Sequence, residues 1–293
     1  MSTQPPNTHT AHPTYTTRGR IVRLAAGYAP LLRVASGECF SHTTALHLYG
    51  APIRTPVELH CTIPDPHGAA RGRGVHGHRC ADPISAVHAN VSETAQPLAC
   101  VPPITALIQS AALLSFRELV VATDHLLKLR GPPGGKYALA TAEEPTARAA
   151  RSRGRGIQRL RAALRVARVG AESRMESLQH FELARMGLDT LELQGVLRDA
   201  RRNWIGRFDA IDRQKQRILE YDGEQHRTDR RQYLRDEARL NLARREGYEV
   251  KRTHYEDFHE HALPGTRRAL CEFLEERPRT LDRPLTRHFS SPY

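Results

Sequence analysis

One stretch of the chain, Trp204 to His226, restricts the possible fold more than any other. Its sequence is WIGRFDAIDRQKQRILEYDGEQH, in which two apolar-rich segments flank a polar run. This pattern predicts a β-hairpin with one strand at 204–211, a turn at 212–215 and a return strand at 216–222. The hairpin therefore determines where the acidic side chains of this stretch lie.

The expected register brings two of these acids together. We take a turn that pairs Asp212 with Lys215. Asp209 then faces Ile218, and Glu220 lies diagonal to Asp209 on the same face of the sheet. Diagonal neighbours are roughly 7–8 Å apart, which lets two carboxylates share one divalent ion. A loop one residue longer would move Glu220 to the opposite face.

The remaining side chains of the hairpin divide between a core and this acidic face. Strand alternation predicts that four side chains point into a core, namely Phe208, Ala210, Leu219 and Tyr221. Asp222 shares a face with Glu220 in either register, and the turn residue Gly223 can bring His226 back over the acids. Three acids and a histidine this close need a cation or raised pKa values, and oxygen ligands favour Mg²⁺ or Mn²⁺. The alternative is that the acids are solvated and only keep the hairpin soluble.

This pattern resembles the PD-(D/E)XK nuclease superfamily, and most closely its branch of very-short-patch-repair endonucleases. The branch motif is an Asp on one strand and Glu-x-Asp-Gly-x-x-His on the next, followed by an Arg-Asp pair on a helix and a Gly-aromatic-x-Val-x-Arg strand. The matching residues here are Asp209, Glu220-Tyr221-Asp222-Gly223-Glu224-Gln225-His226, Arg235-Asp236 and Gly247-Tyr248-Glu249-Val250-Lys251-Arg252. The resemblance covers residues 172–275.

The resemblance implies a fold and a chemistry. The fold is a restriction-endonuclease-like α/β sandwich with a mixed sheet, and the chemistry is metal-dependent hydrolysis of phosphodiester bonds in DNA. Asp209 and Glu220 would hold Mg²⁺ or Mn²⁺, which polarises the phosphate and lowers the pKa of a bound water. His226 would act as general base or protonate the leaving oxygen. Asp222 would orient His226 or bind a second ion, and it stands where the superfamily usually has a Lys.

A further acid, Glu176, precedes the hairpin in the predicted helix ESRMESLQHFELARMG. The resemblance places an acid of this first helix at the metal site, and Glu176 fits that position. Ser173 and Glu176 also form the Ser-x-x-Glu pattern of a capping box, in which Glu176 only caps its own helix. The sequence leaves both explanations open.

The charge of the chain favours an anionic partner. Its 293 residues carry a formal net charge of +12, which is typical of proteins that bind nucleic acid. No run of about 18 apolar residues predicts a membrane span, and the N-terminus lacks the order of a signal peptide. The five cysteines form no CxxC pair, so we expect reduced thiols and a cytoplasmic protein.

Arginines concentrate between Ala147 and Arg168, a segment with eight arginines and no acid. Its first part is flexible by composition and its second part has the pattern of an amphipathic helix. These arginines are therefore candidates for binding DNA phosphates. The candidates are Arg151, Arg153, Arg155 and Arg159, joined by Arg231 and Arg235 of the long helix that follows the hairpin. The alternative is a solvated linker.

The first half of the chain predicts a smaller α+β domain. Its short motifs resemble antitoxins of abortive-infection toxin–antitoxin systems, which implies a toxin protein as a partner. The motifs are Phe40-Ser41-His42-Thr43-Thr44-Ala45, Leu48-Tyr49-Gly50, Leu59-His60-Cys61-Thr62 and Arg73-Gly74-Val75. Histidines and cysteines are dense here, but their spacing matches no standard zinc pattern. We therefore expect ordinary packing for them and no metal.

These observations divide the chain into five segments. They are a disordered tail at 1–18, an α+β antitoxin-like domain at 19–140, an Arg-rich linker and helix at 141–170, a nuclease-like domain at 171–278 and a tail at 279–293. Two functions of different classes follow. One is a Mg²⁺-dependent DNA endonuclease of repair, restriction or phage defence. The other is a non-catalytic DNA-binding regulator or antitoxin that uses the nuclease fold as a binding platform.

Overall fold

The chain folds into two compact units, which we describe separately. The computed structural model describes residues 13–81, 84–131, 137–188, 191–223 and 230–290. The first unit comprises Met1–Leu114 and Ala147–Ile157, and the second comprises Ser115–Thr146 and Gln158–Tyr293. Within the described ranges, no helix has both the length and the apolar character needed to cross a membrane.

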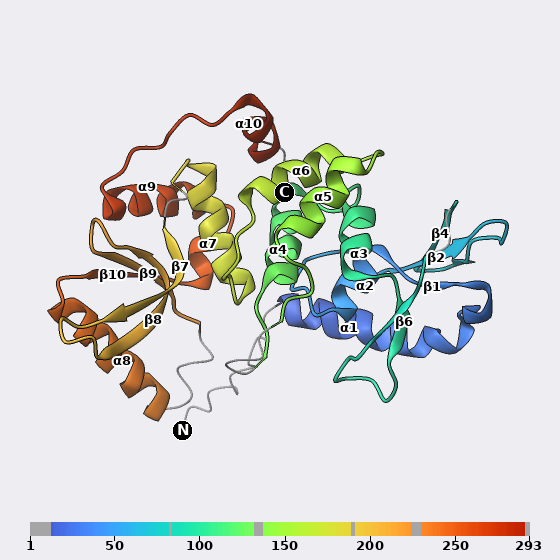
Figure 1. Cartoon of the computed structure of the whole chain (residues 1–293), viewed down its shortest axis with the longest axis horizontal. Helices are drawn as coiled ribbons and strands as arrows, with labels where there is room; N and C mark the ends of the chain where they lie inside the picture. Colours follow the sequence, from blue (N-terminus) through green and yellow to red (C-terminus); the bar gives the residue numbers. More distant parts are fainter. Residues whose placement is uncertain (1–12, 82–83, 132–136, 189–190, 224–229, 291–293) are drawn as a thin grey trace, which may run out of the picture. The chain divides into compact units, whose positions relative to one another are not determined.

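The first unit is organised around a mixed sheet (Figure 1). Its described helices and strands are α1 (Pro13–Tyr28), β1 (Cys39–Phe40), α2 (His42–Leu48), β2 (Leu59–Pro64), β3 (Arg71–Gly72), β4 (Val75–Cys80), β5 (Val87–Ala89), β6 (Leu98–Cys100) and α3 (Pro103–Ser110). The strand order is β3-β4-β2-β1-β6-β5. Strands β2 and β4 pair in parallel, as do β1 and β6, and the other neighbours are antiparallel.

The helices of the first unit follow the local sequence signals with one correction. Helix α2 begins after Ser41, and it ends before Gly50, which takes the left-handed φ of 88° that glycine tolerates. Helix α1 begins at Pro13, inside the segment 1–18 that was expected to be a disordered tail. Ile21, Val22 and Ala25 of α1 are fully buried, and their burial explains why the helix includes this region.

The second unit contains a mixed sheet of its own among the described residues. Its helices and strands are α4 (Phe116–Leu127), α7 (Arg174–Arg185), β7 (Glu192–Arg198), β8 (Trp204–Asp212), β9 (Arg217–Tyr221), α8 (Arg230–Arg245), β10 (Glu249–Thr253), α9 (Leu263–Leu274) and α10 (Arg283–Phe289). Helices α5 (Glu143–Arg151) and α6 (Ile157–Val166) cross the boundaries of the units. The strand order is β10-β9-β8-β7, in which only β9 and β10 are parallel. The predicted α/β class is therefore confirmed.

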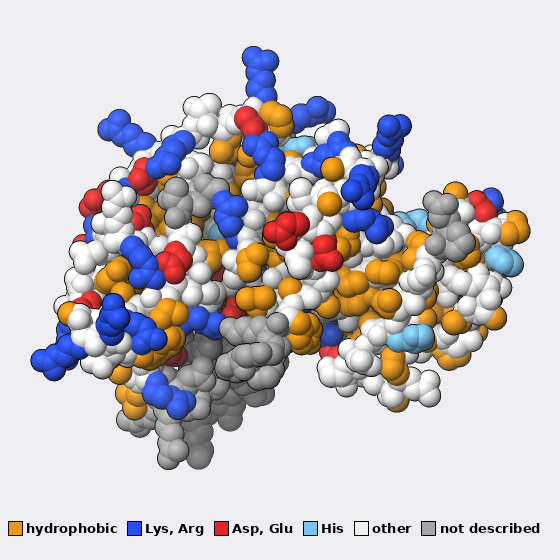
Figure 2. All heavy atoms as spheres, in the orientation of Figure 1, with side chains coloured by type: hydrophobic (Ala, Val, Ile, Leu, Met, Phe, Trp, Pro, Cys, Tyr) orange, Lys and Arg blue, Asp and Glu red, His pale blue; other side chains and the backbone are white. Residues whose placement is uncertain are grey.

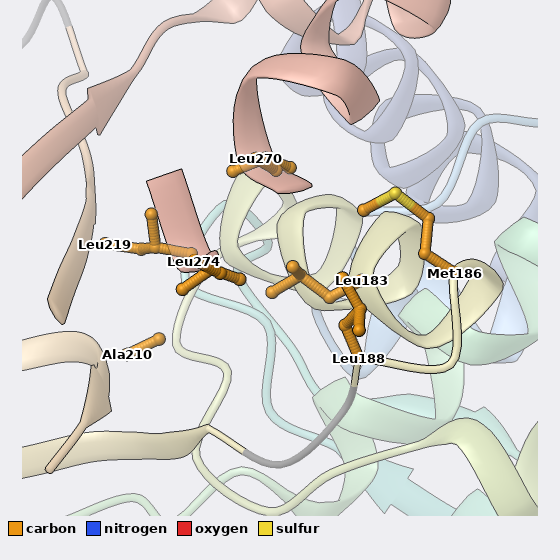
Figure 3. Packing of buried hydrophobic residues seen from close by; sticks show 7 residues of the cluster. All are labelled: Leu183, Met186, Leu188, Ala210, Leu219, Leu270 and Leu274. Atoms are coloured by element: carbon orange, nitrogen blue, oxygen red, sulfur yellow. The ribbon is translucent and has the colours of Figure 1, made fainter. Parts of the chain in front are cut away.

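Helices cover both faces of this second sheet, because each face buries its own apolar cluster. On one face, α7 and α9 pack against β8 and β9, and Figure 3 shows these side chains converging. The cluster consists of Leu183, Met186, Leu188, Ala210, Leu219, Leu270 and Leu274. On the other face, Leu240 and Ala243 of α8 pack against a second cluster, which includes Phe208 and Ile218.

Strand alternation breaks in the middle of β8, which corrects one expectation. Phe208 and Ala210 were expected to share a core face, yet Phe208 packs with α8 and Ala210 packs with α7 and α9. The break lies beside Gln194 of β7, between the pairs Leu193–Ala210 and Gly195–Phe208. Gln194 has a φ of 52°, which is not a strand conformation.

The compact units do not follow the expected segments, because α4 and α10 both belong to the second unit. Glu118 of α4 forms a buried ion pair with Arg174 of α7, in which Nη1 donates to Oε2 at 2.7 Å. Phe289 of α10, a region expected to be tail, lies with its ring centroid 5.0 Å from those of Phe116 and Phe181. These contacts join segments far apart in sequence, so local patterns did not reveal them.

Candidate active site

The hairpin forms as expected, but its turn is longer. The residues that pair are Asp212 with Arg217 and Ala210 with Leu219, so the expected pairing of Asp212 with Lys215 is wrong. The Oδ1 atom of Asp212 accepts the N–H of Lys215 at 2.9 Å, which holds Lys215 within the turn. Gln216 then takes a φ of 53° before β9 begins.

The longer turn brings the two principal acids closer than expected. Because the register shifts by two residues, Glu220 stays on the face of Asp209 and moves from a diagonal position to one directly opposite. The backbone N–H of Asp209 donates to Oε1 of Glu220 at 3.2 Å. The backbone N–H of Tyr221 donates to Oδ2 of Asp209 at 2.8 Å. Each carboxylate thus bonds to the backbone of the strand that carries the other acid.

Glu176 joins these acids through Gln194. The amide Nε2 of Gln194 donates to Oε2 of Glu176 at 2.8 Å and to Oδ1 of Asp209 at 3.4 Å. Glu176 also accepts the N–H of Glu172 at 2.8 Å, and its own N–H donates to Oγ of Ser173 at 3.2 Å. Glu176 therefore takes part in the start of its helix through Ser173 and Glu172, and it also bonds to Gln194 beside Asp209. A role at a metal site stays a prediction.

A cation that the sequence analysis did not identify completes the site. Nη2 of Arg239 lies 2.9 Å from Oε2 of Glu220, and Nη1 lies 3.4 Å from Oε1. The guanidinium also stacks 4.6 Å from the ring centroid of Phe208. The sequence gave no reason to separate Arg239 from its exposed neighbours, because only the packing of α8 on the sheet brings it to Glu220. We call Glu176, Asp209 and Glu220, with Gln194 and Arg239, the acidic cluster.

Burial and mutual repulsion shift the protonation of the three acids in the same direction. Burial first, and then the charge of Asp209, raise the pKa of Glu220 to about 7, although Arg239 opposes the shift. Burial and Asp209 likewise raise the pKa of Glu176 to about 7. Burial also raises the pKa of Asp209 itself. One guanidinium therefore does not balance the negative charge of the cluster, and a further cation would be favourable here.

Asp222 contacts β10, both through its side chain and through its backbone. Its Oδ2 is 3.6 Å from Nη1 of Arg252 on β10, and Arg252 in turn pairs with Glu237 of α8. The backbone N–H of Asp222 donates to the carbonyl oxygen of Thr253 at 2.9 Å. His226, the other candidate of this motif, lies outside the described residues. The role of Asp222 in orienting His226 stays a prediction.

The candidate DNA-binding arginines differ in exposure. Arg151, Arg153 and Arg155 are exposed and Arg159 is half-buried, between the end of α5 and the start of α6. Arg235 on α8 is exposed, and the side chain of Arg231 lies outside the described residues. Figure 2 shows Lys and Arg side chains spread over the visible face of the protein. The exposed candidates are available to a phosphate backbone.

The donor set of the acidic cluster fits a hard divalent cation. Carboxylate oxygens are the ligands that Mg²⁺ and Mn²⁺ prefer, and burial, followed by the charge of Asp209, raises the pKa of both Glu176 and Glu220. In the present arrangement Arg239 bonds to both oxygens of Glu220. Correspondingly, no three His, Cys, Asp or Glu side chains among the described residues converge on one metal position.

The first unit gathers histidines in a way that the sequence spacing did not predict. The ring centroid of His78 lies 3.8 Å from that of His42 and 5.2 Å from that of His60, and His76 lies 5.2 Å from His60. Parallel pairing of β2 with β4 produces the arrangement, since His60 is opposite His76. We call these four residues the histidine stack. The expectation that this half needs no metal stays a prediction.

Comparison with known proteins adds no relative. Neither the protein-family models, nor the curated proteins, nor the solved structures contain a match to this chain.

Proposed function

We propose that this protein is a divalent-metal-dependent DNA endonuclease that hydrolyses phosphodiester bonds, and that its second unit is a restriction-endonuclease-like α/β sandwich. The observation that carries the proposal is the direct opposition of Asp209 and Glu220 across the hairpin, joined by the hydrogen bond at 3.2 Å. Glu176 adds a third acid through Gln194. Three carboxylates in one cluster, of which Glu220 is buried and the other two are half-buried, are costly to a fold and common at metal-dependent hydrolytic sites.

In this proposal each residue of the acidic cluster has a separate role. Asp209 and Glu220 hold Mg²⁺ or Mn²⁺, and Glu176 adds negative charge nearby. The bound cation polarises the scissile phosphate and lowers the pKa of a water. Gln194 keeps Glu176 and Asp209 in place by donating to both. The resemblance assigns His226 as the general acid or base and Asp222 as its orienting partner.

DNA is the substrate because its backbone matches the charge of the protein. The chain carries a net charge of +12, which favours a polyanion. Arg151, Arg153, Arg155 and Arg235 are exposed and would bind phosphates, and Arg159 lies beside them in sequence. Such contacts supply affinity that falls as salt rises, with little sequence preference.

One observation supports a second candidate function. Arg239 already forms a hydrogen-bonded ion pair with Glu220, and both oxygens of Asp209 accept hydrogen bonds from the protein. A cluster satisfied in this way is compatible with a non-catalytic DNA-binding regulator or antitoxin, with a toxin protein as its partner. In that case the nuclease-like unit serves only as a binding platform.

The test pairs plasmid nicking with thermal melting, with and without Mg²⁺, for wild type and Asp209→Asn. We expect the substitution to abolish nicking and to remove any Mg²⁺-dependent rise in Tm, because a ligand stabilises only the state that binds it. The metal-free Tm should stay the same or rise, because one of three repelling charges is gone. His226→Ala should keep the Mg²⁺ shift and slow nicking by roughly 10²–10⁴-fold.

Glu246→Gln is the matched control, because Glu246 is an exposed acid that follows α8. It should change neither nicking nor the Mg²⁺ shift. If wild type shows neither property on plasmid and short duplex DNA, the enzyme proposal is overturned. Retained DNA binding would then support the regulator.

A further inference from the structure

Arg239 reaches Glu220 along a path that the sheet leaves open for it. A Cβ added to Gly206 of β8 would lie 2.5 Å from Cδ and 2.6 Å from Cγ of Arg239, so any larger residue at this position would obstruct the arginine. Beyond Gly206, the guanidinium lies over the ring of Phe208 and donates to the backbone oxygen of Arg207. The route therefore depends on a glycine, an aromatic ring and a carbonyl in one strand.

The interaction at the end of this route involves the atoms that a metal would use. Nη2 and Nη1 of Arg239 face Oε2 and Oε1 of Glu220 at 2.9 and 3.4 Å. The Arg239 side chain is only 22% exposed and that of Glu220 only 11% exposed, so water screens their attraction weakly. A divalent cation on Glu220 would meet a fixed positive charge at the same oxygens. Guanidinium and metal thus compete for one carboxylate.

A phosphodiester is the natural alternative partner of the displaced guanidinium. Its planar fork of donors pairs bidentately with phosphate as well as with carboxylate. Asp236, another acid near Arg239, lies 3.7 Å away and is 36% exposed, so it offers a weaker site than Glu220. A phosphate bound beside the cluster would take over the charge of Arg239 and free the oxygens of Glu220.

We propose that Arg239 is a positioning residue that holds Glu220 closed to metal until a phosphodiester binds, so that DNA and the divalent cation bind with positive coupling. This inference rests on the proposed function and adds that binding of DNA favours binding of the cation. Coupling between two ligands is reciprocal. DNA must therefore raise the affinity for the cation by the factor by which the cation raises the affinity for DNA.

The first arm of the test measures Mn²⁺ binding to the full chain without DNA, by the electron paramagnetic resonance of free Mn²⁺. Arg239→Gln should bind Mn²⁺ at least about fivefold more tightly than wild type, within the usual range of coupling between sites. Arg239→Lys keeps the charge but loses the bidentate fork, so its affinity should lie between the two. Arg244→Gln is the matched control, because Arg244 is an exposed arginine on the same helix that bonds to Asn241.

The second arm measures binding of a fluorescent DNA duplex by anisotropy, with Ca²⁺ or with no divalent ion. Ca²⁺ should tighten DNA binding by wild type and by Arg244→Gln, and it should have little effect on Arg239→Gln. If Arg239→Gln does not fold, Arg239→Lys tests the proposal in its place. This variant should have a Mn²⁺ affinity above that of wild type, and Ca²⁺ should tighten its DNA binding less than it does for wild type.

The outcomes separate the two proposals. Equal Mn²⁺ affinities of wild type and the Arg239 variants would overturn the role of Arg239 and leave the nuclease proposal standing. Mn²⁺ that binds to none of these proteins, with or without DNA, would overturn the metal-dependent function itself. Tighter Mn²⁺ binding by the variants supports the inference, even where wild type binds none without DNA.

Discussion

The histidine stack and the acidic cluster each bring several titratable side chains close together, but the surroundings of these side chains differ. Both crowd several titratable side chains beside a sheet, one in the first unit and one in the second. In the stack, His42 and His60 are buried, and Nδ1 of His60 lies 3.0 Å from Nε2 of His78. In the cluster, Glu220 is buried against a guanidinium.

The two units differ in how they avoid the free-energy penalty of an unpaired buried charge. Burial and the neighbouring imidazoles lower the pKa of His42 to about 3 and that of His60 to about 4, so these two rings are uncharged at neutral pH. In the second unit, three buried acids pair with arginines. These pairs are Glu118 with Arg174, Glu182 with Arg267, and Glu220 with Arg239. Stability of the first unit should therefore fall as the pH falls, whereas stability of the second unit should depend on single ion-pair partners and change with pH in the opposite direction.

The largest expected effect comes from breaking one of these pairs. In Glu118→Gln, the side chain of Arg174, which is 6% exposed, keeps its charge but loses the carboxylate opposite. We expect a loss of about 3–5 kcal/mol in the free energy of unfolding of the second unit, because an uncompensated buried charge is costly. Trp204, the single tryptophan of the chain, lies on β8 and reports this unfolding in urea by its fluorescence.

Two further variants make the result specific. Glu192→Gln breaks an exposed pair with Arg213 and should cost less than about 1 kcal/mol. The double substitution Glu118→Leu with Arg174→Met should recover most of the loss, because an apolar pair needs no compensation. A loss in Glu118→Gln no larger than that in Glu192→Gln would contradict the dependence on buried partners.

Most of the secondary structure behind this comparison could be predicted, because its signals are local. The hairpin strands, the helix from Arg230 and the strand ending at Thr253 all follow from hydrophobic patterns within about twenty residues. The sequence also predicted that Asp209 and Glu220 share one face of the hairpin. Their register was not predicted, since it depends on the side chain of Asp212 bonding within the turn.

The partners of the buried groups could not be predicted, because they come from distant segments. Arg239 follows Glu220 by 19 residues, and Arg174 follows Glu118 by 56. Neither arginine differs in local pattern from the exposed arginines around it. The histidine stack needs the parallel pairing of β2 with β4, which periodicity does not reveal. Residue types thus indicated which chemistry was present, and tertiary packing decided which groups meet.

A second prediction sets the two units against each other along the pH axis. The pKa values of His42 and His60 are lower in the folded state than in the unfolded state, where they are near 6.5. Their contribution is complete above pH 6.5 and is lost as pH falls toward 4 and 3. The pKa values of Glu176 and Glu220 are raised from 4.5 to about 7. Their contribution is complete below pH 4.5 and is lost as pH rises through 7.

The measurement is hydrogen exchange by mass spectrometry on the full chain, with rates corrected for the intrinsic effect of pH. Between pH 6.5 and 5, β2 and β4 should lose about 2–3 kcal/mol of protection, since each histidine contributes up to about 1.4 kcal/mol per pH unit. Over the same interval β8 and β9 should gain protection. Changes of the same sign in both units would show that these clusters do not control their pH dependence.

The smallest expected effect isolates one ring of the stack. His42 has a φ of 51°, a backbone conformation that Asn adopts more easily than most residues, so His42→Asn removes the imidazole with little backbone strain. The acid-dependent loss of protection in β2 and β4 should shrink by about 1 kcal/mol between pH 6.5 and 5, because one group no longer takes up a proton on unfolding. Protection of β8 and β9 should not change. His88→Asn is the control, since His88 is exposed on β5. If the two variants have the same pH slope as wild type, His42 is not one of the groups that make the first unit acid-sensitive, and the stack must act through His60 and its other neighbours.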